Sequence, residues 1–486
     1  MSLTVRADRF LIRGAGGSIR HVLAEINAPE APSSATRPPV NVALVLDRSG
    51  SMGGERIVLA RQAVEHALRL LKPQDRFALV VFDDVVVAST AASAEAKRHA
   101  LRELAKVDAR GSTNLAGGWE AGCEQVVAHL GVETIGRCLL VTDGQANVGE
   151  RAPEAVSALA AAMRQRGVAT STFGIGADFD ERTLQRMAEG GQGHFYYVAA
   201  PQAIPDLLTS ELGDSLEVVA RDAALVVRVP ADVDVEPVGP FRVAAAGRVV
   251  RVELGDLTSG QELQLVLRLK FGVGADDETR VVTFSVAAKD DALGTMSQDI
   301  QWTFDDHALN DRQPRDRVVD RAAARVYAAL ARQQALALNR EGRYDDARCV
   351  LERVAMKIAD FAGHDAELGE IVEGLREDLE AFAARMDPVL AKQRHFASLC
   401  RVAFADGGRE VEEAVMRRIE SARHRERLDL LGRRADAHPP RWPLLVRVRP
   451  RVRPGATQSS SKGIKRCRQQ GLGPAASGRG AETPAG

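Results

Sequence analysis

The sequence predicts a multidomain protein: an α/β doubly wound domain, a β-sandwich, an α-helical C-terminal region and a disordered tail. Three observations support this prediction. The chain has 486 residues, too many for one compact core. Apolar runs alternate with amphipathic helical stretches over residues 40–212, which is typical of a parallel sheet covered on both faces. Beyond residue 212 the pattern changes to short alternating runs and then to sequence rich in Ala, Leu, Arg and Glu.

The first strand of the α/β domain is the continuous apolar run NVALVLD, as expected for a strand buried on both faces. The next stretch has apolar residues at helical spacing, which predict a buried stripe. They are Ile57, Ala60, Val64, Ala67 and Leu71. The runs RFALVVF, CLLVTD, VATSTFGI and HFYYV predict further strands, with helices around residues 115–130 and 152–166. The run VVVAST follows too closely for a crossover helix, so we expect an antiparallel edge strand in this Rossmann-like sheet.

Residues 213–305 predict a β-sandwich, because runs with partial two-residue alternation are separated by Gly, Pro and Asp turns. These runs are ALVVRV, RVVRVEL, ELQLVLRLKF and RVVTFSV. Residues 1–39 contain another strand-like run, RHVLAEI, followed by a Pro/Ser-rich linker. We expect this N-terminal strand to pair into the later sandwich, so that the α/β domain of residues 40–212 is an insertion.

Residues 306–431 have a helix-forming composition. One part, ALALNREGRYDDARCVLERVA, resembles a single unit of a tetratricopeptide repeat. A solenoid of such repeats needs about three copies to bury a continuous core, so a plain helical hairpin is an equal alternative.

Residues 432–486 are basic and rich in Arg, Pro, Ser and Gly, which is typical of a disordered tail. Such a tail can bind anionic polymers. It lacks the interleaved aromatic residues of base-stacking sites, so we do not expect nucleic acid as the partner. A solvated tail, or a C-terminus read in the wrong frame, explains the composition more simply.

Composition and charge favour a cytoplasmic protein. The formal net charge is -1, which points to neither nucleic acid nor membrane as a partner. The five cysteines show no pairing or metal-ligand spacing and indicate reduced thiols. The N-terminus lacks the apolar segment of a signal peptide, and no apolar stretch reaches the length of a transmembrane helix. The sequence predicts no particular oligomeric state.

Polar side chains follow the predicted strands where a doubly wound sheet binds its ligands, beyond the carboxyl ends of the strands. Asp47 ends the first strand, and Ser49 and Ser51 follow at alternate positions. Thr113 lies in a loop just before a helix, and Asp143 ends a later central strand. Few carboxylates combined with hydroxyl groups make a hard, all-oxygen set that suits Mg²⁺.

The order Asp-x-Ser-x-Ser, Thr, Asp resembles the metal-ion-dependent adhesion site of von Willebrand factor A domains. The resemblance covers about residues 40–212 and includes the closing FGIGADFDERTLQRMAEGGQGHFYYV, which is similar to bacterial members. It implies a metal site made of Asp47, Ser49, Ser51, Thr113 and Asp143. By this resemblance Thr113 binds the ion directly or through water, and Asp143 acts mainly through water or by contacting the residues that bind the ion. The implied ion is Mg²⁺, with Mn²⁺ and Ca²⁺ as alternatives.

Each of these residues also has a structural explanation when taken alone. Asp47 can cap a helix, Thr113 can be an N-cap, and Asp143 with Gly144 can form a tight turn. Their joint order and placement favour the metal site over this combination.

The function that the sequence favours is metal-dependent protein–protein interaction, in which the ion accepts an Asp or Glu side chain of a partner. We expect no enzymatic activity, because the motifs HExxH, GxSxG and GxxxxGK[ST] are absent. His194 fits a strand residue better than a catalytic base. The alternatives are a metal-assisted hydrolase and a subunit of an ATPase or chelatase-like assembly.

Overall fold

The structure is a computed structural model of the chain. It describes the following residues: 1–31, 38–82, 84–110, 114–144, 149–150, 152–176, 178–198, 201–289 and 296–403. The predicted basic tail and Thr113 therefore lie outside the described residues.

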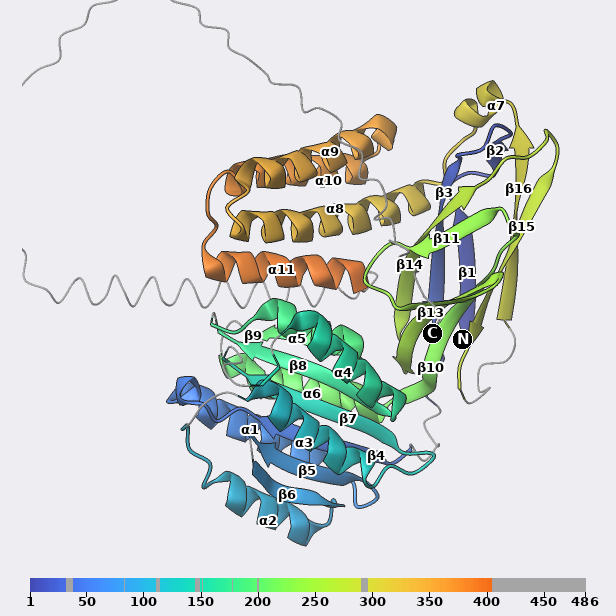
Figure 1. The fold of residues 1–486 in the computed structure, drawn as a ribbon. Helices are drawn as coiled ribbons and strands as arrows, with labels where there is room; N and C mark the ends of the chain where they lie inside the picture. Colours follow the sequence, from blue (N-terminus) through green and yellow to red (C-terminus); the bar gives the residue numbers. More distant parts are fainter. Residues whose placement is uncertain are drawn as a thin grey trace, which may run out of the picture. The chain divides into compact units, whose positions relative to one another are not determined.

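The α/β domain is built on a six-stranded sheet with the order β6-β5-β4-β7-β8-β9 (Figure 1). All neighbouring strands are parallel except β6, which pairs antiparallel with β5 at the sheet edge, as the sequence predicts. The central strands β4 and β7 are buried along their whole length because both faces of the sheet are covered. The strands are β4 (Val40–Leu46), β5 (Arg76–Val81), β6 (Asp84–Ala91), β7 (Ile135–Thr142), β8 (Val168–Ile175) and β9 (Gln192–Val198).

Helices cover both faces of this sheet. One face packs against α1 (Glu55–Leu70), α2 (Ala94–Leu104) and α6 (Ile204–Leu216). The other face packs against α3 (Leu115–Val127), α4 (Pro153–Gln165) and α5 (Glu181–Gly190). Short 3-10 turns, η1 (Gly50–Met52) and η2 (Pro201–Ala203), precede α1 and α6. The alternation of strands and helices thus produces the doubly wound arrangement that the sequence predicts.

Helix α3 approaches the centre of the sheet closely because it carries glycines on its inner face. A Cβ atom on Gly122 would lie 2.4 Å from a methyl group of Val45, and one on Gly118 would lie 2.6 Å from the ring of Phe82. The bulky Trp119 lies between these two positions in the chain and is fully buried. The glycines therefore set how near α3 comes to β4 and β5.

Two further sheets pack over a shared apolar core. The first has the order β1-β3-β14-β11 and the second the order β12-β13-β10-β15-β16-β2. The first sheet contains β1 (Ser2–Ala7), β3 (Ile19–Asn27), β11 (Val233–Pro237) and β14 (Glu262–Phe271). The second contains β2 (Leu11–Arg13), β10 (Val218–Arg228), β12 (Val243–Ala246), β13 (Val249–Thr258), β15 (Thr279–Ala287) and β16 (Met296–Asp305). Because β3 pairs with β14 along its length, strands from before and after the α/β domain share one sheet.

The chain leaves and re-enters this pair of sheets at one turn. The amide of Ala28, just after β3, donates to the carbonyl of Gln261 at 2.8 Å. The carbonyl of Glu217, just before β10, accepts from the amide of Ser259 at 2.9 Å. Both connections to the α/β domain therefore lie beside residues 258–261.

A buried ion-pair network joins the α/β domain to β13. The carboxylate of Asp256 contacts Arg137 of β7 at 2.8 Å and Arg164 of α4 at 2.6 Å. Burial raises the pKa of Asp256, but the two guanidinium groups lower it by more than burial raises it. The pKa of Asp256 is therefore well below its ordinary value. Asp256 therefore stays ionised inside this contact.

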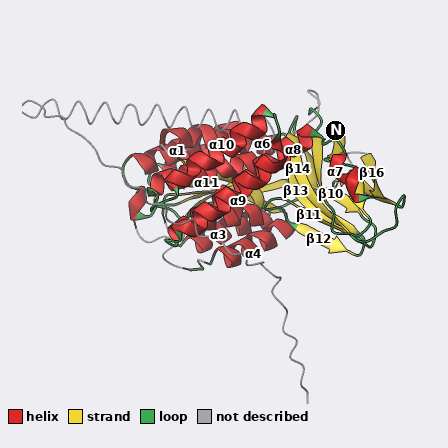
Figure 2. Cartoon of the chain, turned by 90° about the horizontal axis from the view of Figure 1, so that it is seen from above, coloured by secondary structure: helices red, strands yellow, loops and turns green. Residues whose placement is uncertain are grey.

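Five helices follow the sandwich: α7 (His307–Arg312), α8 (Arg317–Arg340), α9 (Tyr344–Ala362), α10 (Ala366–Ala381) and α11 (Pro388–Ala403). Asp306, Asp316 and Asp365 begin three of them by accepting backbone amides of the first turn. The first half of α8 packs on β3 and β14, and its second half shares a core with α9, α10 and α11. We call α8–α11 the helical arm. Figure 2 shows the strands of the two sheets grouped to one side of these helices.

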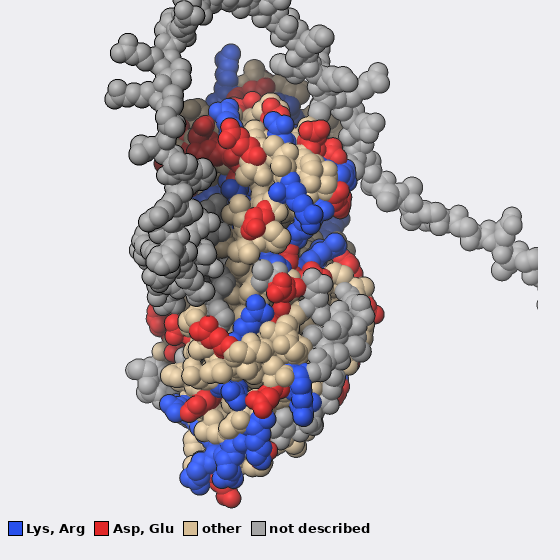
Figure 3. Space-filling view, turned by 90° about the vertical axis from the view of Figure 1, so that its left-hand side faces the viewer, with Lys and Arg blue, Asp and Glu red and all other residues tan. Residues whose placement is uncertain are grey.

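Among the described residues, no helix is both long and apolar enough to cross a membrane. On the face drawn in Figure 3, acidic and basic side chains are interspersed, apart from a basic group at its lower end. This mixture agrees with the net charge of -1.

Candidate metal centre

Four of the predicted site residues, Asp47, Ser49, Ser51 and Asp143, meet where β4 and β7 end side by side. These strands are parallel neighbours, with Leu46 paired to Val141, so the residues that follow them share one edge of the sheet. The amide of Asp47 continues the ladder by donating to the carbonyl of Val141 at 2.9 Å. Asp47 and Asp143 are thus placed next to each other by strand register.

The carboxylate of Asp47 is held by neutral donors. One oxygen accepts the amide of Ser49 at 2.7 Å, and the other accepts the hydroxyl of Thr142 at 2.6 Å. Asp47 is fully buried, and this burial raises its pKa despite these hydrogen bonds. The fold therefore keeps a carboxylate at the strand end, where loss of hydration disfavours its charge.

The two serines link Asp47 to Asp143. The hydroxyls of Ser49 and Ser51 lie 3.0 Å apart, and the hydroxyl of Ser51 donates to Asp143 Oδ1 at 2.7 Å. The two hydroxyls lie close together because the chain after β4 enters the 3-10 turn η1 directly after Ser49. The structure thus brings together Asp47, Ser49, Ser51 and Asp143, whereas Thr113 lies outside the described residues.

A basic residue that the sequence reasoning missed completes this cluster. The guanidinium of Arg56 forms an ion pair with Asp143 Oδ2 and lies 3.4 Å from the carbonyl of Ser51. Arg56 is the second residue of α1, where the helix dipole disfavours a positive charge. A positive charge in the first turn of a helix is therefore the signal in the sequence that could have indicated a role for Arg56.

The donor set suits a hard divalent cation. It consists of two fully buried carboxylates and two serine hydroxyls, which are the oxygen ligands that Mg²⁺ prefers. Among the described residues, no group of three or more His, Cys, Asp or Glu has an arrangement for metal binding. A site here therefore depends on hydroxyl and water ligands as well as carboxylates.

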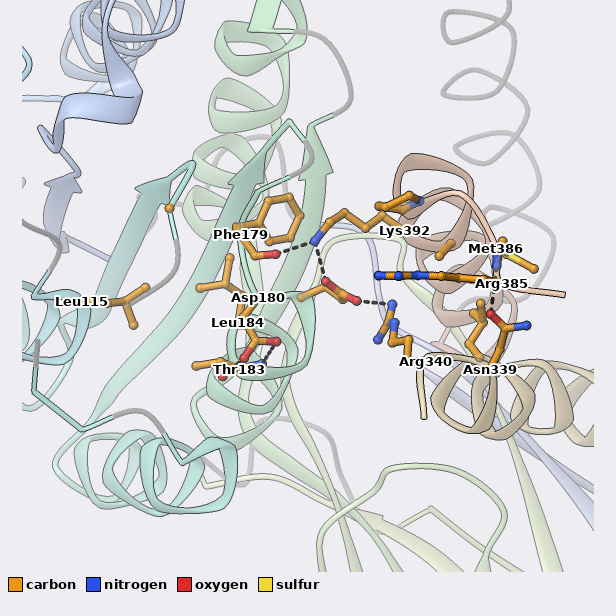
Figure 4. Close-up of a pocket in the computed structure, with 15 residues that line it drawn as sticks. Leu115, Phe179, Asp180, Thr183, Leu184, Asn339, Arg340, Arg385, Met386 and Lys392 are labelled. Atoms are coloured by element: carbon orange, nitrogen blue, oxygen red, sulfur yellow. Dashed lines mark hydrogen bonds and ion pairs between the residues drawn. The ribbon is translucent and has the colours of Figure 1, made fainter. Parts of the chain in front are cut away.

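A cavity of about 540 Å³ lies beside this edge of the sheet. Gly144 and Leu115, which adjoin the predicted metal loops, are among the residues that line it. Figure 4 shows Leu115 on the side opposite the helical arm. The helical arm lines the other side with Arg340, Arg385 and Lys392. The edge that carries the candidate metal site thus also borders a cavity lined by these three basic side chains and by the acidic Asp180 and Glu181.

Lys392 fastens the arm to the start of α5 at this cavity. Its ammonium group donates to the carboxylate of Glu181 at 2.5 Å and to the carbonyl of Phe179, and it lies 4.1 Å from the centroid of the Phe179 ring. Arg340 of α8 contacts the same carboxylate (Figure 4). Burial raises the pKa of Glu181, but these two cations outweigh it and leave the pKa below its ordinary value.

Comparison with known proteins identifies the inserted domain. The family model described as von Willebrand factor type A domain matches residues 41–210. The uncharacterized protein YfbK of Escherichia coli is 28% identical over 284 residues, which cover 55% of this chain and 48% of YfbK. The human inter-alpha-trypsin inhibitor heavy chain H4 is 29% identical over 167 residues, 32% of this chain and 18% of that protein. The chain thus spans about half of YfbK, the first of these relatives.

Solved structures extend the likeness of fold beyond this domain. A von Willebrand factor type A protein from Catenulispora acidiphila superposes with a TM-score of 0.64 at 18% identity, covering 82% of this chain and 96% of that one. The ArnB paralog VWA2 from Sulfolobus acidocaldarius gives a TM-score of 0.54 at 15% identity, covering 83% and 99%. At these identities the likeness concerns the fold alone.

Proposed function

Because residues 41–210 form a von Willebrand factor type A domain, we propose that this chain is a divalent-metal-dependent protein-interaction module. It binds a partner through an Asp or Glu side chain of that partner. The observation that carries the proposal is the convergence of Asp47, Ser49, Ser51 and Asp143 at one strand edge.

The residues have separate roles in this proposal. Asp47, Ser49 and Ser51 hold the ion, and Thr113 joins them on the evidence of its place in the sequence motif. Asp143 orients the Ser51 hydroxyl, whose proton it accepts at 2.7 Å. When bound, Mg²⁺ supplies a positive, open position for the carboxylate of the partner. The role is binding rather than catalysis.

The neighbouring cavity supports a peptide-like partner. A carboxylate at the metal would leave its adjoining residues near a cavity that carries Arg340 and Arg385. Arg385 is exposed and forms no ion pair with another described residue. Asp180 and Glu181 also line the cavity, but Glu181 already pairs with Arg340 and Lys392. The charge of Arg385 therefore favours an acidic segment over a basic one at this border of the site.

The test is metal binding followed by partner capture. Titration calorimetry with MgCl₂ and MnCl₂ should show binding to the wild type and a loss of about tenfold or more in affinity for Asp47→Asn, which keeps the side-chain shape. Asp108→Ala removes an exposed carboxylate from the same domain and should leave affinity unchanged. Partner capture should then need Mg²⁺ and fail with Asp47→Ala; capture that persists in excess chelator contradicts the proposal.

A further inference from the structure

Arg56 is the one cation that contacts the candidate metal ligands within the part of the chain that the structure describes. Its guanidinium pairs with Asp143 on its inner side and lies 3.9 Å from the carboxylate of Asp178 on its outer side. The group packs over Gly176, where a Cβ atom would lie 3.2 Å from the Arg56 Nη2 atom. Arg56 therefore lies between two carboxylates, one buried and one exposed.

The charges of the site explain why a cation is needed here. Asp47 and Asp143 are both fully buried at adjacent strand ends. Asp47 is satisfied by an amide and a hydroxyl, which carry no net charge. Asp143 accepts the hydroxyl of Ser51 and, in addition, pairs with the guanidinium of Arg56. A buried carboxylate that loses its counter-charge is strongly destabilising, so Arg56 stabilises the cluster when no ion neutralises it.

A divalent ion and the Arg56 guanidinium then compete to neutralise the carboxylate of Asp143. Both are positive, and two cations a few ångströms apart repel each other strongly in a partly buried site. Arg56 has an alternative position, because its side chain is 29% exposed and the Asp178 carboxylate beside it is 72% exposed. A small rotation of the guanidinium toward Asp178 would relieve the repulsion.

We propose that Arg56 is a built-in competitor of the metal: it neutralises Asp143 when the ion is absent and moves to Asp178 when the ion binds. This inference rests on the proposed metal site. Arg56 then lowers the affinity of the site for the metal, and it stabilises the folded domain when the metal is absent.

The experiment measures Mg²⁺ affinity by titration calorimetry and melting temperature in EDTA for the full chain and its variants. Arg56→Gln should bind Mg²⁺ about tenfold more tightly, because the repulsion is removed, and should melt several degrees lower in EDTA. Arg56→Lys keeps the charge and should remain close to the wild type. Arg61→Gln is the matched control, because it removes a positive charge from the same helix whose partners are the carbonyls of Ala105 and Val107.

Asp178→Asn tests the second position. It should weaken Mg²⁺ binding severalfold in the wild type and have a much smaller effect in the Arg56→Gln background, because only Arg56 uses Asp178 as a partner in this scheme. An equal effect in both backgrounds overturns the movement to Asp178. Equal Mg²⁺ affinity of wild type and Arg56→Gln overturns the competition. A wild type that binds neither Mg²⁺ nor Mn²⁺ refutes the proposed function itself, and the inference with it.

Discussion

Asp47 and Asp143 follow neighbouring strands and are equally buried, but different groups satisfy them. Neutral donors hold Asp47, whereas Asp143 accepts both the neutral hydroxyl of Ser51 and the charged guanidinium of Arg56. The two carboxylates therefore differ in how they can bind a cation. Asp47 has no cation to displace among the described residues, whereas Asp143 must first lose its ion pair with Arg56. This difference agrees with a direct role for Asp47 and an indirect one for Asp143.

Glu211 is another buried carboxylate of the α/β domain, on α6. It accepts the hydroxyls of Ser171 and Tyr196 and contacts His194 Nδ1 at 3.0 Å. Burial raises its pKa, but the charge of His194 and these hydrogen bonds lower it to about 2. His194 is thus bound in a structural network at strand β9, as its strand position suggests.

This network predicts acid sensitivity. The unfolded chain protonates Glu211 near its ordinary pKa of 4.5, whereas the folded chain keeps it charged down to about 2. Its contribution to the free energy of unfolding is therefore complete above 4.5 and lost as pH falls toward 2. Urea denaturation between about pH 5 and pH 2 should show a shallower pH slope for Glu211→Gln than for the wild type. The exposed Glu133→Gln should keep the wild-type slope; parallel curves for all three chains contradict the prediction.

The sequence predicted four of the residues that the structure brings together at the strand edge, because strand ends and alternate serines leave a linear signature. The contact of Arg56 with Asp143 joins positions 87 residues apart. Thr142, which holds Asp47, reads in the sequence as an ordinary strand residue. Such contacts depend on strand register, which the sequence does not specify residue by residue.

At the scale of the elements, α11 contacts α5 of the inserted domain through buried polar side chains. Lys392 and Glu181 are 7% and 9% exposed, and Lys392 also covers the ring of Phe179. His395, one turn later, contacts the side chain of Gln185 at 2.6 Å, and burial lowers its pKa to about 4. The arm is therefore fastened to α5 by polar groups that lack access to water.

Breaking this contact should loosen the arm. Lys392→Met keeps the length of the side chain but leaves Glu181 with Arg340 as its remaining cation, and should cost about 3 kcal/mol of unfolding free energy. Lys357→Met, at an exposed position of α9, should change it by less than about 0.5 kcal/mol. Urea denaturation measures both, and limited proteolysis should cut Lys392→Met faster near α11. Equal cleavage of the two variants would mean that the apolar core of the arm holds α11 without Lys392.

The elements that the sequence predicted best are the buried strands, whose apolar runs leave little choice. It did not predict α2 or α6. Helix α2 buries only Ala100 and Leu104, which is too weak a stripe to detect. Helix α6 contains Pro205 and Gly213, residues that usually mark the ends of helices. The edge strand β12 is exposed throughout, so it shows no alternation.

For the molecule as a whole, Asp256 is the main polar link between the α/β domain and the sandwich. Asp256→Asn should cost about 3 kcal/mol, because it removes the buried carboxylate that both Arg137 and Arg164 contact, although Arg164 keeps Asp222 and the side-chain oxygen of Gln192. Asp234→Asn, at an exposed position of β11, should have little effect.

Tryptophan fluorescence can follow each part separately in this test. Trp119 lies in the core of the α/β domain and Trp302 in that of the sandwich. With Trp442 replaced by Phe, Trp119→Phe and Trp302→Phe variants each report one part. Asp256→Asn should separate two transitions that coincide in the wild type; transitions that stay coincident show that the apolar contacts couple the parts.

The pairing of β3 with β14 also determines when each part can form during synthesis. Glu25 and Gln264 contact each other across 239 positions of the chain, so the first sheet stays incomplete until the ribosome has released β14. The inserted domain has all of its strands available earlier and is made of closer contacts, which form faster. We therefore expect it to fold first and to bring residues 28 and 217 close together. Until β14 is made, the N-terminal pair of strands β1 and β3 would expose the edge of β3, which could pair with the strands of other chains.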